Sequence, residues 1–265
     1  MKFCAHLTSG SRSQRCKHMR IWGTYPWSLS RCASLKPRLG LLNFHGGRMT
    51  LTLNRPWMTF DLGSPHRILS WAMNRPGYAT SRHILWREVR NADLPPELDV
   101  STWFAEELRT RNASDAIAFL TSRDIRAYDD KTVSAGDTYA RCIATVGLSN
   151  AEHIGTRIDR SQKDWGTINI AVQVGCGLTD TALIEALAIA TQARTRAVMS
   201  VGHMLPTGVA TGTGTDCVAI AVPVGNALPT RVPTDAKDAV ERCVYDAVAA
   251  GAQRWVETVK REEAP

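Results

Sequence analysis

The stretch ATGTGTDCVAIAV, residues 210–222, joins a turn rich in glycine and threonine to a run of small and β-branched apolar residues. The apolar run is typical of a buried strand, and glycines allow the preceding turn to approach a ligand closely. Threonine hydroxyls and backbone amides there can bond a polar group, although a solvated tight turn has the same composition. The stretch therefore predicts a buried strand with a candidate site at its entrance.

Strands and helices alternate on both sides of this stretch. The pattern of apolar residues predicts strands at 51–62 with an interruption at Arg55-Pro56, and at 67–73, 116–120, 141–146 and 167–174. It predicts helices at 99–111 (capped by Asp99 or Ser101), 180–200 (capped by Thr179 or Asp180) and 236–260. The order predicts a single layered α/β domain with a mixed β-sheet and packed helices, and an α+β sandwich is the alternative.

The basic charge of the chain belongs to its first part. The whole chain has a net charge of +7, but residues 1–48 hold nine Lys or Arg and no acidic residue. The remainder has 23 basic against 25 acidic residues, so its net charge is near −2. This distribution argues against a nucleic-acid-binding domain, and no apolar run approaches the ~20 residues of a membrane span.

Residues 1–48 lack the periodicity of a folded unit. We predict that they are a disordered extension, or that the translation start has been assigned too far upstream and the true start lies at or near Met49. An organelle transit peptide is a further option. Residues 49–265 then form the domain. Their cysteines, Cys142, Cys176, Cys217 and Cys243, are too scattered for a zinc site and are expected to be reduced in a cytoplasmic protein. Cys217 is a weak candidate nucleophile because no histidine partner is evident.

Polar clusters occur where the predicted elements end. The segments are LTSR (120–123), TVGLSNA (145–151), GTINI (166–170), ATQART (190–195) and ATGTGTD (210–216). Each also has a structural explanation: Ser122 can cap, Asn150 can occupy a left-handed turn, and Asn169 can be a satisfied polar group. Thr191 and Thr195 lie four residues apart on one helix face, where their hydroxyls can bond the preceding turn.

In these five segments, which follow the family's order, the chain resembles the adenosylcobinamide amidohydrolases over about residues 55–257. The resemblance implies hydrolysis of the amide that joins the aminopropanol arm to the corrin ring, giving adenosylcobyric acid and 1-aminopropan-2-ol in cobalamin precursor salvage. Related enzymes also act on complete corrinoids with an unsuitable lower base. The expected partner is a corrinoid small molecule that brings its own cobalt, so we expect no cofactor and no metal site in the protein.

Amide hydrolysis needs a base, an attacking oxygen and donors for the oxyanion. We predict Asp216 as the base or orienting carboxylate, with Glu152 second, and either Thr213, Thr215 or a water as the nucleophile. The amides of Gly212 to Thr215 are the candidate oxyanion donors, assisted by Asn169 or Asn150. The other predicted substrate-binding residues are Thr211, Gly212, Gly214, Ser122, Arg123, Thr191, Gln192, Arg194 and Thr195, while Trp71, Trp86 and Trp165 are candidates to line the pocket.

Two positions depart from the family pattern. Gln192 stands where many members have Glu, and the segment 230–234 lacks a histidine that typically precedes the last helix. Glutamine cannot act as a base, and the absent histidine puts in doubt any role of that residue, whether contacting the substrate or handling a proton. These departures leave open a corrinoid-binding protein without catalysis as the alternative. His153, beside Glu152, is the histidine that we expect nearest the site.

Overall fold

The computed structural model of the protein describes residues 49–156, 166–225 and 231–262. Our predictions for residues 1–48, Trp165 and Thr230 lie outside these ranges. The principal elements are β1 (Thr50–Asn54), β2 (Trp57–Ser70), β3 (Gly77–Glu88), α1 (Val100–Thr110), β4 (Ile117–Thr121), β5 (Tyr128–Ala135), β6 (Thr138–Val146), β7 (Ala151–Glu152), β8 (Ile168–Val174), α2 (Asp180–Ser200), β9 (Met204–Leu205), β10 (Gly208–Val209), β11 (Gly212–Thr213), β12 (Cys217–Pro223) and α3 (Thr234–Glu262).

One mixed sheet forms the centre of the fold. Its strand order is β4-β3-β2-β12-β8-β6-β5, and β1 pairs with β2 outside this path. The pairs β12–β8 and β3–β4 are parallel, while β1–β2, β2–β3, β2–β12, β6–β8 and β5–β6 are antiparallel. The predicted α/β domain with a mixed sheet and packed helices is therefore confirmed.

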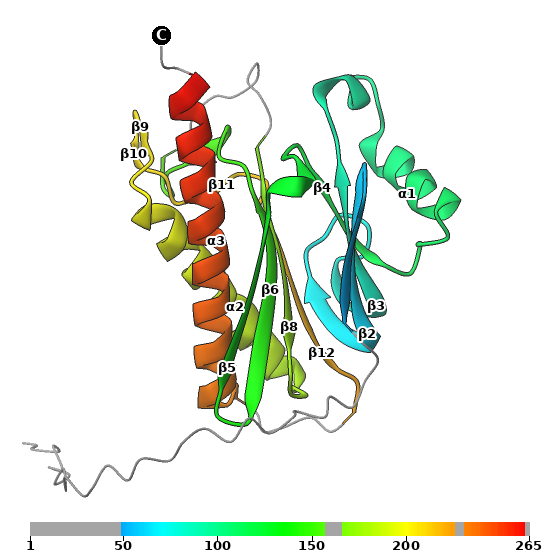
Figure 1. Cartoon of the computed structure of the whole chain (residues 1–265). Helices are drawn as coiled ribbons and strands as arrows, with labels where there is room; N and C mark the ends of the chain where they lie inside the picture. Colours follow the sequence, from blue (N-terminus) through cyan, green and yellow to red (C-terminus); the bar gives the residue numbers. More distant parts are fainter. Residues whose placement is uncertain (1–48, 157–165, 226–230, 263–265) are drawn as a thin grey trace, which may run out of the picture. The chain divides into compact units, whose positions relative to one another are not determined.

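Helices α2 and α3 cover one face of the half of the sheet that contains β12, β8 and β6, while α1 covers the half that contains β3 and β4. Val218 and Ile220 of β12 pack in the cluster formed with α2 and α3, whereas Ala219 between them faces the other way, as strand alternation requires. Phe104 of α1 packs with Leu85 of β3 in a separate cluster. Figure 1 shows α2 and α3 side by side, with α1 beyond the strands β2 to β4.

The sheet bends so strongly that its two halves face each other. In a flat sheet, β4 and β8 would lie about 19 Å apart, because three strands separate them. Instead, Asn169 Nδ2 of β8 donates a hydrogen bond of 2.7 Å to the carbonyl oxygen of Leu120 on β4. The fully buried rings of Phe60 and Trp86 occupy the core between the halves.

Strand β2 differs from its prediction. The sequence predicts separate strands at 51–62 and 67–73, but β2 continues without a break from Trp57 to Ser70. Its pairing with β3 shifts register between Asp61 and His66, where Gly63 has a φ of 83°. The prediction of two strands was wrong because the irregular pairing between Asp61 and His66, where Pro65 lies, shifts the register without ending the strand.

The helices begin where the capping residues predict. Asp99 caps α1 by accepting from the amides of Ser101 and Thr102, and Thr179 caps α2 by accepting from the amide of Ala182. Among the described residues, no helix combines the length and apolar character needed to cross a bilayer.

A buried histidine in this core gives the fold a pH dependence. His66 is 4% exposed; its Nδ1 lies 2.8 Å from the carbonyl oxygen of Ser64 and its Nε2 lies 3.0 Å from Gln173 Nε2. Because Nε2 must accept from the Gln173 amide, the neutral ring fits this site. Burial lowers the pKa of His66 below its ordinary value of 6.5.

We expect the melting temperature to fall as the pH is lowered from 7.5 to 5.5. Unfolded His66 takes up a proton below about pH 6.5, whereas folded His66 does so at lower pH, so acid favours the unfolded state in that window. Thermal melts of His66→Gln should show a smaller pH dependence than the unchanged protein. His83→Gln is the control because the His83 side chain is 39% exposed; equal slopes for all three proteins would contradict the assignment.

Candidate active site

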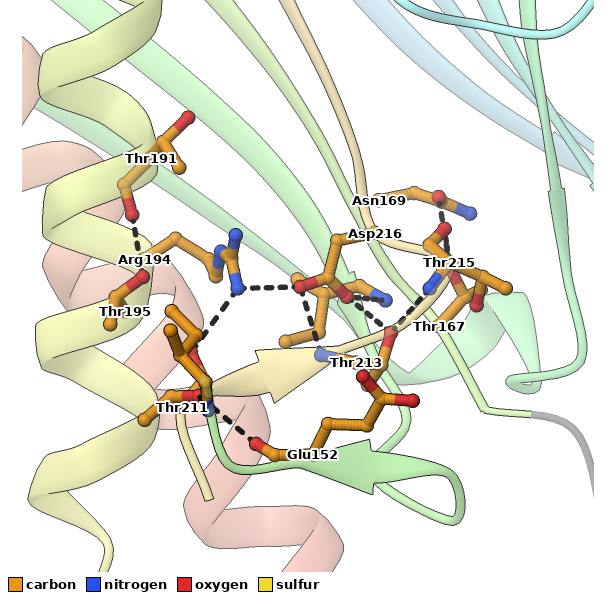
Figure 2. A network of polar contacts seen from close by, with 12 residues as sticks. Glu152, Thr167, Asn169, Thr191, Arg194, Thr195, Thr211, Thr213, Thr215 and Asp216 are labelled. Atoms are coloured by element: carbon orange, nitrogen blue, oxygen red, sulfur yellow. Dashed lines mark hydrogen bonds and ion pairs between the residues drawn. The ribbon is translucent and has the colours of Figure 1, made fainter. Parts of the chain in front are cut away.

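The glycine- and threonine-rich run lies between a short hairpin partner and the central strand of the sheet. Gly212 and Thr213 form β11, which pairs with β7 so that Gly212 is opposite Glu152. β12 begins at Cys217, directly after the run. Figure 2 shows Arg194 of α2 reaching toward the run from the helix side.

Asp216 is the centre of a hydrogen-bond network. Its Oδ1 accepts from the Ile168 amide at 3.1 Å and from the Thr213 hydroxyl in a short bond, while its Oδ2 accepts from the Thr213 amide at 3.0 Å. Oδ2 also lies 2.6 Å from Nη1 of Arg194, which donates to the Thr211 carbonyl oxygen at 3.2 Å. The carboxylate is thereby fixed in one orientation (Figure 2).

The Asp216–Arg194 ion pair is buried, with the two side chains 5% and 11% exposed. Burial raises the pKa of Asp216 above its ordinary value, and the positive charge of Arg194 together with the bonds from Thr213 and Ile168 offsets part of this rise. A carboxylate with a raised pKa accepts a proton more readily than a solvated one. The environment of Asp216 therefore suits a general base.

Glu152 lies on the hairpin side of the run. Its backbone carbonyl accepts from the amide of Thr211 at 2.8 Å and from the Thr211 hydroxyl at 3.0 Å. A Cβ placed on Gly214 would come within 3.0 Å of Glu152 Oε1, so the second predicted carboxylate also lies against the run.

The cleft side of the run is held by Thr215 and its neighbours. The Thr215 hydroxyl donates to the Gly166 carbonyl oxygen at 2.9 Å and accepts from Asn150 Nδ2 at 3.3 Å. The Thr167 hydroxyl donates to the Thr215 carbonyl oxygen at 2.8 Å, and Asn169 bonds β4 as described above. Residues from three of the predicted segments thus meet around Thr215.

A cleft of about 620 Å³ opens beside these residues. Its polar side contains Thr121, Ser122, Gly166, Thr167, Asn169, Gly214, Thr215 and Asp216, and its apolar side includes Trp71, Met73, Leu94, Pro95, Pro96 and Leu98. The volume falls within the range of small-molecule sites. The ends of β2, β4, β8 and β12 meet here because the sheet is bent.

The helix segment 190–195 divides between two environments. Thr191 and Thr195 donate to the carbonyl oxygens of Leu187 and Thr191, one turn back along α2. Gln192 is exposed and borders a separate cleft between α2 and α3, about 200° around the helix from Arg194. The residue of this segment that reaches Asp216 is Arg194. Gln192, which stands where many family members have Glu, is not part of that ion pair, so the difference at this position leaves the pair intact.

The remaining predicted residues, Ser122, Arg123, His153 and Cys217, differ in their surroundings. Ser122 borders the cleft, and the Cβ of Arg123 lies 3.8 Å from a Cβ placed on Gly147. His153 Nδ1 lies 2.8 Å from the carbonyl oxygen of Val209, just before the run. Cys217 borders the cleft, but burial raises the pKa of its thiol to about 12, which keeps it protonated.

The segment that lacks the family histidine is attached to the start of α2. Arg231 Nη2 lies 2.6 Å from Oε1 of Glu185, and the Val232 amide donates to Glu185 Oε2 at 2.9 Å. Glu185 precedes Arg194 by nine residues, or about 14 Å along a helix. The described part of this segment is therefore anchored about 14 Å along α2 from Arg194, the residue that pairs with Asp216.

Sequence reasoning did not predict that the segment between β3 and α1 borders the cleft. Of the tryptophans predicted to line the pocket, Trp71 does so and Trp86 does not. Trp71 borders the cleft, and its Nε1 donates to the carbonyl oxygen of Asp216 at 2.7 Å, whereas Trp86 lies in the core. Pro95 and Pro96, with Leu94 and Leu98 on either side, form part of the cleft. Leucines flanking two prolines in an otherwise polar loop were the signal available for that segment.

Gly212 cannot carry a side chain without disturbing the ion pair. An added Cβ would overlap Nη1 of Arg194 and lie 2.7 Å from Oδ2 of Asp216. We expect Gly212→Ala to lower the free energy of unfolding by about 1–3 kcal/mol, as overpacking does in buried sites. Urea denaturation would measure the change, with Gly147→Ala as the control because its Cβ would meet neighbours at an ordinary 3.6 Å. Equal stability of the two variants would contradict the expectation.

Comparison with known proteins gives one family and two distant structures. The sequence model of a family described as adenosylcobinamide amidohydrolase matches residues 44–260. No curated protein sequence matches the chain. A Burkholderia sp. beta-aminopeptidase is 8% identical, with a TM-score of 0.40 over 80% of this chain and 83% of that chain. The PH0078 protein from Pyrococcus horikoshii OT3 is 10% identical, with a TM-score of 0.41 over 82% and 81%. At these TM-scores the two structures carry no information about chemistry.

Proposed function

Because the chain belongs to the adenosylcobinamide amidohydrolase family, we propose that it hydrolyses the amide joining the aminopropanol arm to the corrin ring of adenosylcobinamide. Water adds across the C–N bond, so the ring keeps a carboxylate and the arm leaves as 1-aminopropan-2-ol. The acid product, adenosylcobyric acid, then re-enters cobalamin synthesis. The reaction is one of precursor salvage in the cytoplasm.

The observation that carries the proposal is the arrangement of the cleft. Asp216, Thr215 and Gly214 border it on one side, and Trp71 and Leu98 border it on the other. A corrinoid presents polar amide arms around a broad, partly apolar ring. A cleft with both kinds of surface suits such a ligand.

Asp216 is the base in this proposal. Its bond to the Thr213 hydroxyl and its pairing with Arg194 resemble the general pattern of a nucleophile, a base and a group that orients the base. Asp216 takes the proton either from a threonine hydroxyl that attacks the carbonyl or from a water that attacks in its place. The same proton is then available for the departing amine, which must leave protonated. On the threonine route, loss of the amine leaves a threonine ester, which a water then hydrolyses to the carboxylate.

The oxyanion is stabilised by backbone amides of the run. Gly214 and Thr215 are exposed and border the cleft, and the Thr215 amide makes a long contact of 3.4 Å with the Thr213 hydroxyl. A backbone amide with a weak partner keeps its donor available, and a donor held in place by the fold needs no reorganisation when negative charge develops. Asn150, bonded to Thr215, supports this part of the run.

Incubation of the purified protein with adenosylcobinamide tests the proposal. We expect stoichiometric release of 1-aminopropan-2-ol, measured by amine derivatisation and mass spectrometry, together with a corrinoid that has gained a carboxylate. The same assay on cobinamide without the upper ligand and on complete corrinoids defines the preferred substrate. Corrinoid binding without amine release would contradict the proposal and favour a binding protein.

A further inference from the structure

The cleft exposes large apolar side chains next to the polar run. Trp71 is 42% exposed and Met73 is 53% exposed, and both border the cleft just after β2. The bond from Trp71 Nε1 to the Asp216 carbonyl oxygen fixes the indole ring while leaving part of it open. An exposed and fixed aromatic ring beside a polar site is typical of a surface that binds a flat ligand.

A second apolar group comes from the segment between β3 and α1. Pro95 and Pro96 are exposed, and Leu98 is partly exposed. The proline rings restrict the backbone, and the Leu98 amide donates to the Pro95 carbonyl oxygen at 3.0 Å. At the start of the segment, the Arg90 amide donates to Asp93 Oδ2 at 2.8 Å. This group is therefore built in advance of any ligand.

We infer that Trp71, Met73, Pro95, Pro96 and Leu98, together called the apolar wall, bind one face of the corrin ring independently of the aminopropanol arm. The inference rests on the proposed function and assigns ring recognition to residues other than Ile168, Thr213 and Arg194, which bind the Asp216 carboxylate. Apolar contact area with the ring supplies the binding free energy. The arm contributes contacts at Thr215 and Gly214, where the amide is held for attack.

One consequence is inhibition by corrinoids that have no arm. Cobyric acid, which keeps the ring and lacks the aminopropanol amide, should bind the wall and compete with adenosylcobinamide. We expect an inhibition constant within about tenfold of the KM, because the apolar area buried by the ring is the same in both ligands. Equilibrium dialysis with cobyric acid, followed by its visible absorbance, measures the binding directly.

Two methionines provide a matched pair of variants. Met73 borders the cleft and is 53% exposed, while Met204 on β9 is 65% exposed and does not border it. Met73→Ala should weaken cobyric acid binding and raise the KM for adenosylcobinamide by about fivefold with kcat unchanged, as expected for lost apolar contact. Met204→Ala should change neither quantity. Trp71→Leu should weaken cobyric acid binding further than Met73→Ala.

The outcomes separate this inference from the proposed function. Amine release by the unchanged protein, with no dialysis signal for cobyric acid and equal KM values for the two methionine variants, would overturn the apolar wall and leave the reaction standing. Cobyric acid binding that depends on Met73, without any amine release, would support the wall and overturn the hydrolysis.

Discussion

Asp216→Asn is expected to lower kcat for amine release by about a thousandfold, within the range that general bases contribute. Asparagine keeps the size of the side chain and can still accept from the Thr213 amide, but it cannot take a proton. The Asp216 side chain is buried and has four donor groups from three residues around it, so a base from solvent cannot replace it effectively. Steady-state amine release at saturating adenosylcobinamide measures the loss.

Asp129→Asn is the matched control for this variant. Asp129 is also buried and accepts from Arg254 at 2.8 and 3.0 Å, but it lies on the edge strand β5, whereas Asp216 precedes the central strand β12. Its replacement should reduce stability and leave kcat nearly unchanged. A kcat for Asp216→Asn close to that of Asp129→Asn would remove Asp216 from the role of base.

The pH profile gives a second view of the same group. Since burial raises the pKa of Asp216, kcat should fall on the acid side at a higher pH than an ordinary aspartate would cause. The base acts when deprotonated, so activity is present above this pKa and is lost as the pH falls through it. The residual activity of Asp216→Asn should lack that acid limb.

Arg194→Met is expected to lower the free energy of unfolding by about 3–5 kcal/mol, the cost of leaving a buried charge without its partner. Both members of the pair are largely inaccessible to solvent, so water cannot replace the guanidinium. The variant also loses the bond to the Thr211 carbonyl oxygen. Urea denaturation monitored by circular dichroism measures the change.

Arg231→Met provides the exposed counterpart. Its side chain is 83% exposed and pairs with Glu185 at 2.6 Å, so its loss should cost about 1 kcal/mol or less. The double variant Arg194→Met/Asp216→Asn should be less destabilised than the sum of its single variants, because neither side then carries an unpaired charge. Additive losses in the double variant would mean that the two side chains act independently.

The sequence predicted the elements whose residues carry a strong local signal. Asp99 and Thr179 marked helix starts, and the apolar run after Asp216 marked β12. β5 was missed because it is an edge strand with many exposed polar residues, and β3 because it begins with alternating exposed positions. In such strands, backbone pairing rather than apolar pattern decides the structure.

In the candidate site, too, the features with a local sequence signal were predicted and those that depend on contacts between distant residues were not. The turn between β11 and β12 was predicted from its own composition, and the approach of Asn169 and Arg194 to it followed from the family motifs. The hydrogen bond from Trp71 to Asp216 could not be predicted, because it depends on the antiparallel pairing of β2 with β12, two strands that are far apart in the sequence. Thr191 and Gln192 were predicted as site residues from their motif, but Thr191 bonds the preceding helix turn and Gln192 borders a separate cleft.

The bend of the sheet also sets when the site can exist during folding. The bond between Asn169 and Leu120 joins positions 49 residues apart, and that between Trp71 and Asp216 joins positions 145 residues apart. Contacts over such separations close long loops and form slowly, whereas a helix such as α2 can form from local interactions. Catalytic competence is therefore among the last properties that the folding chain acquires, and it depends on the closure of the whole domain rather than on any one motif.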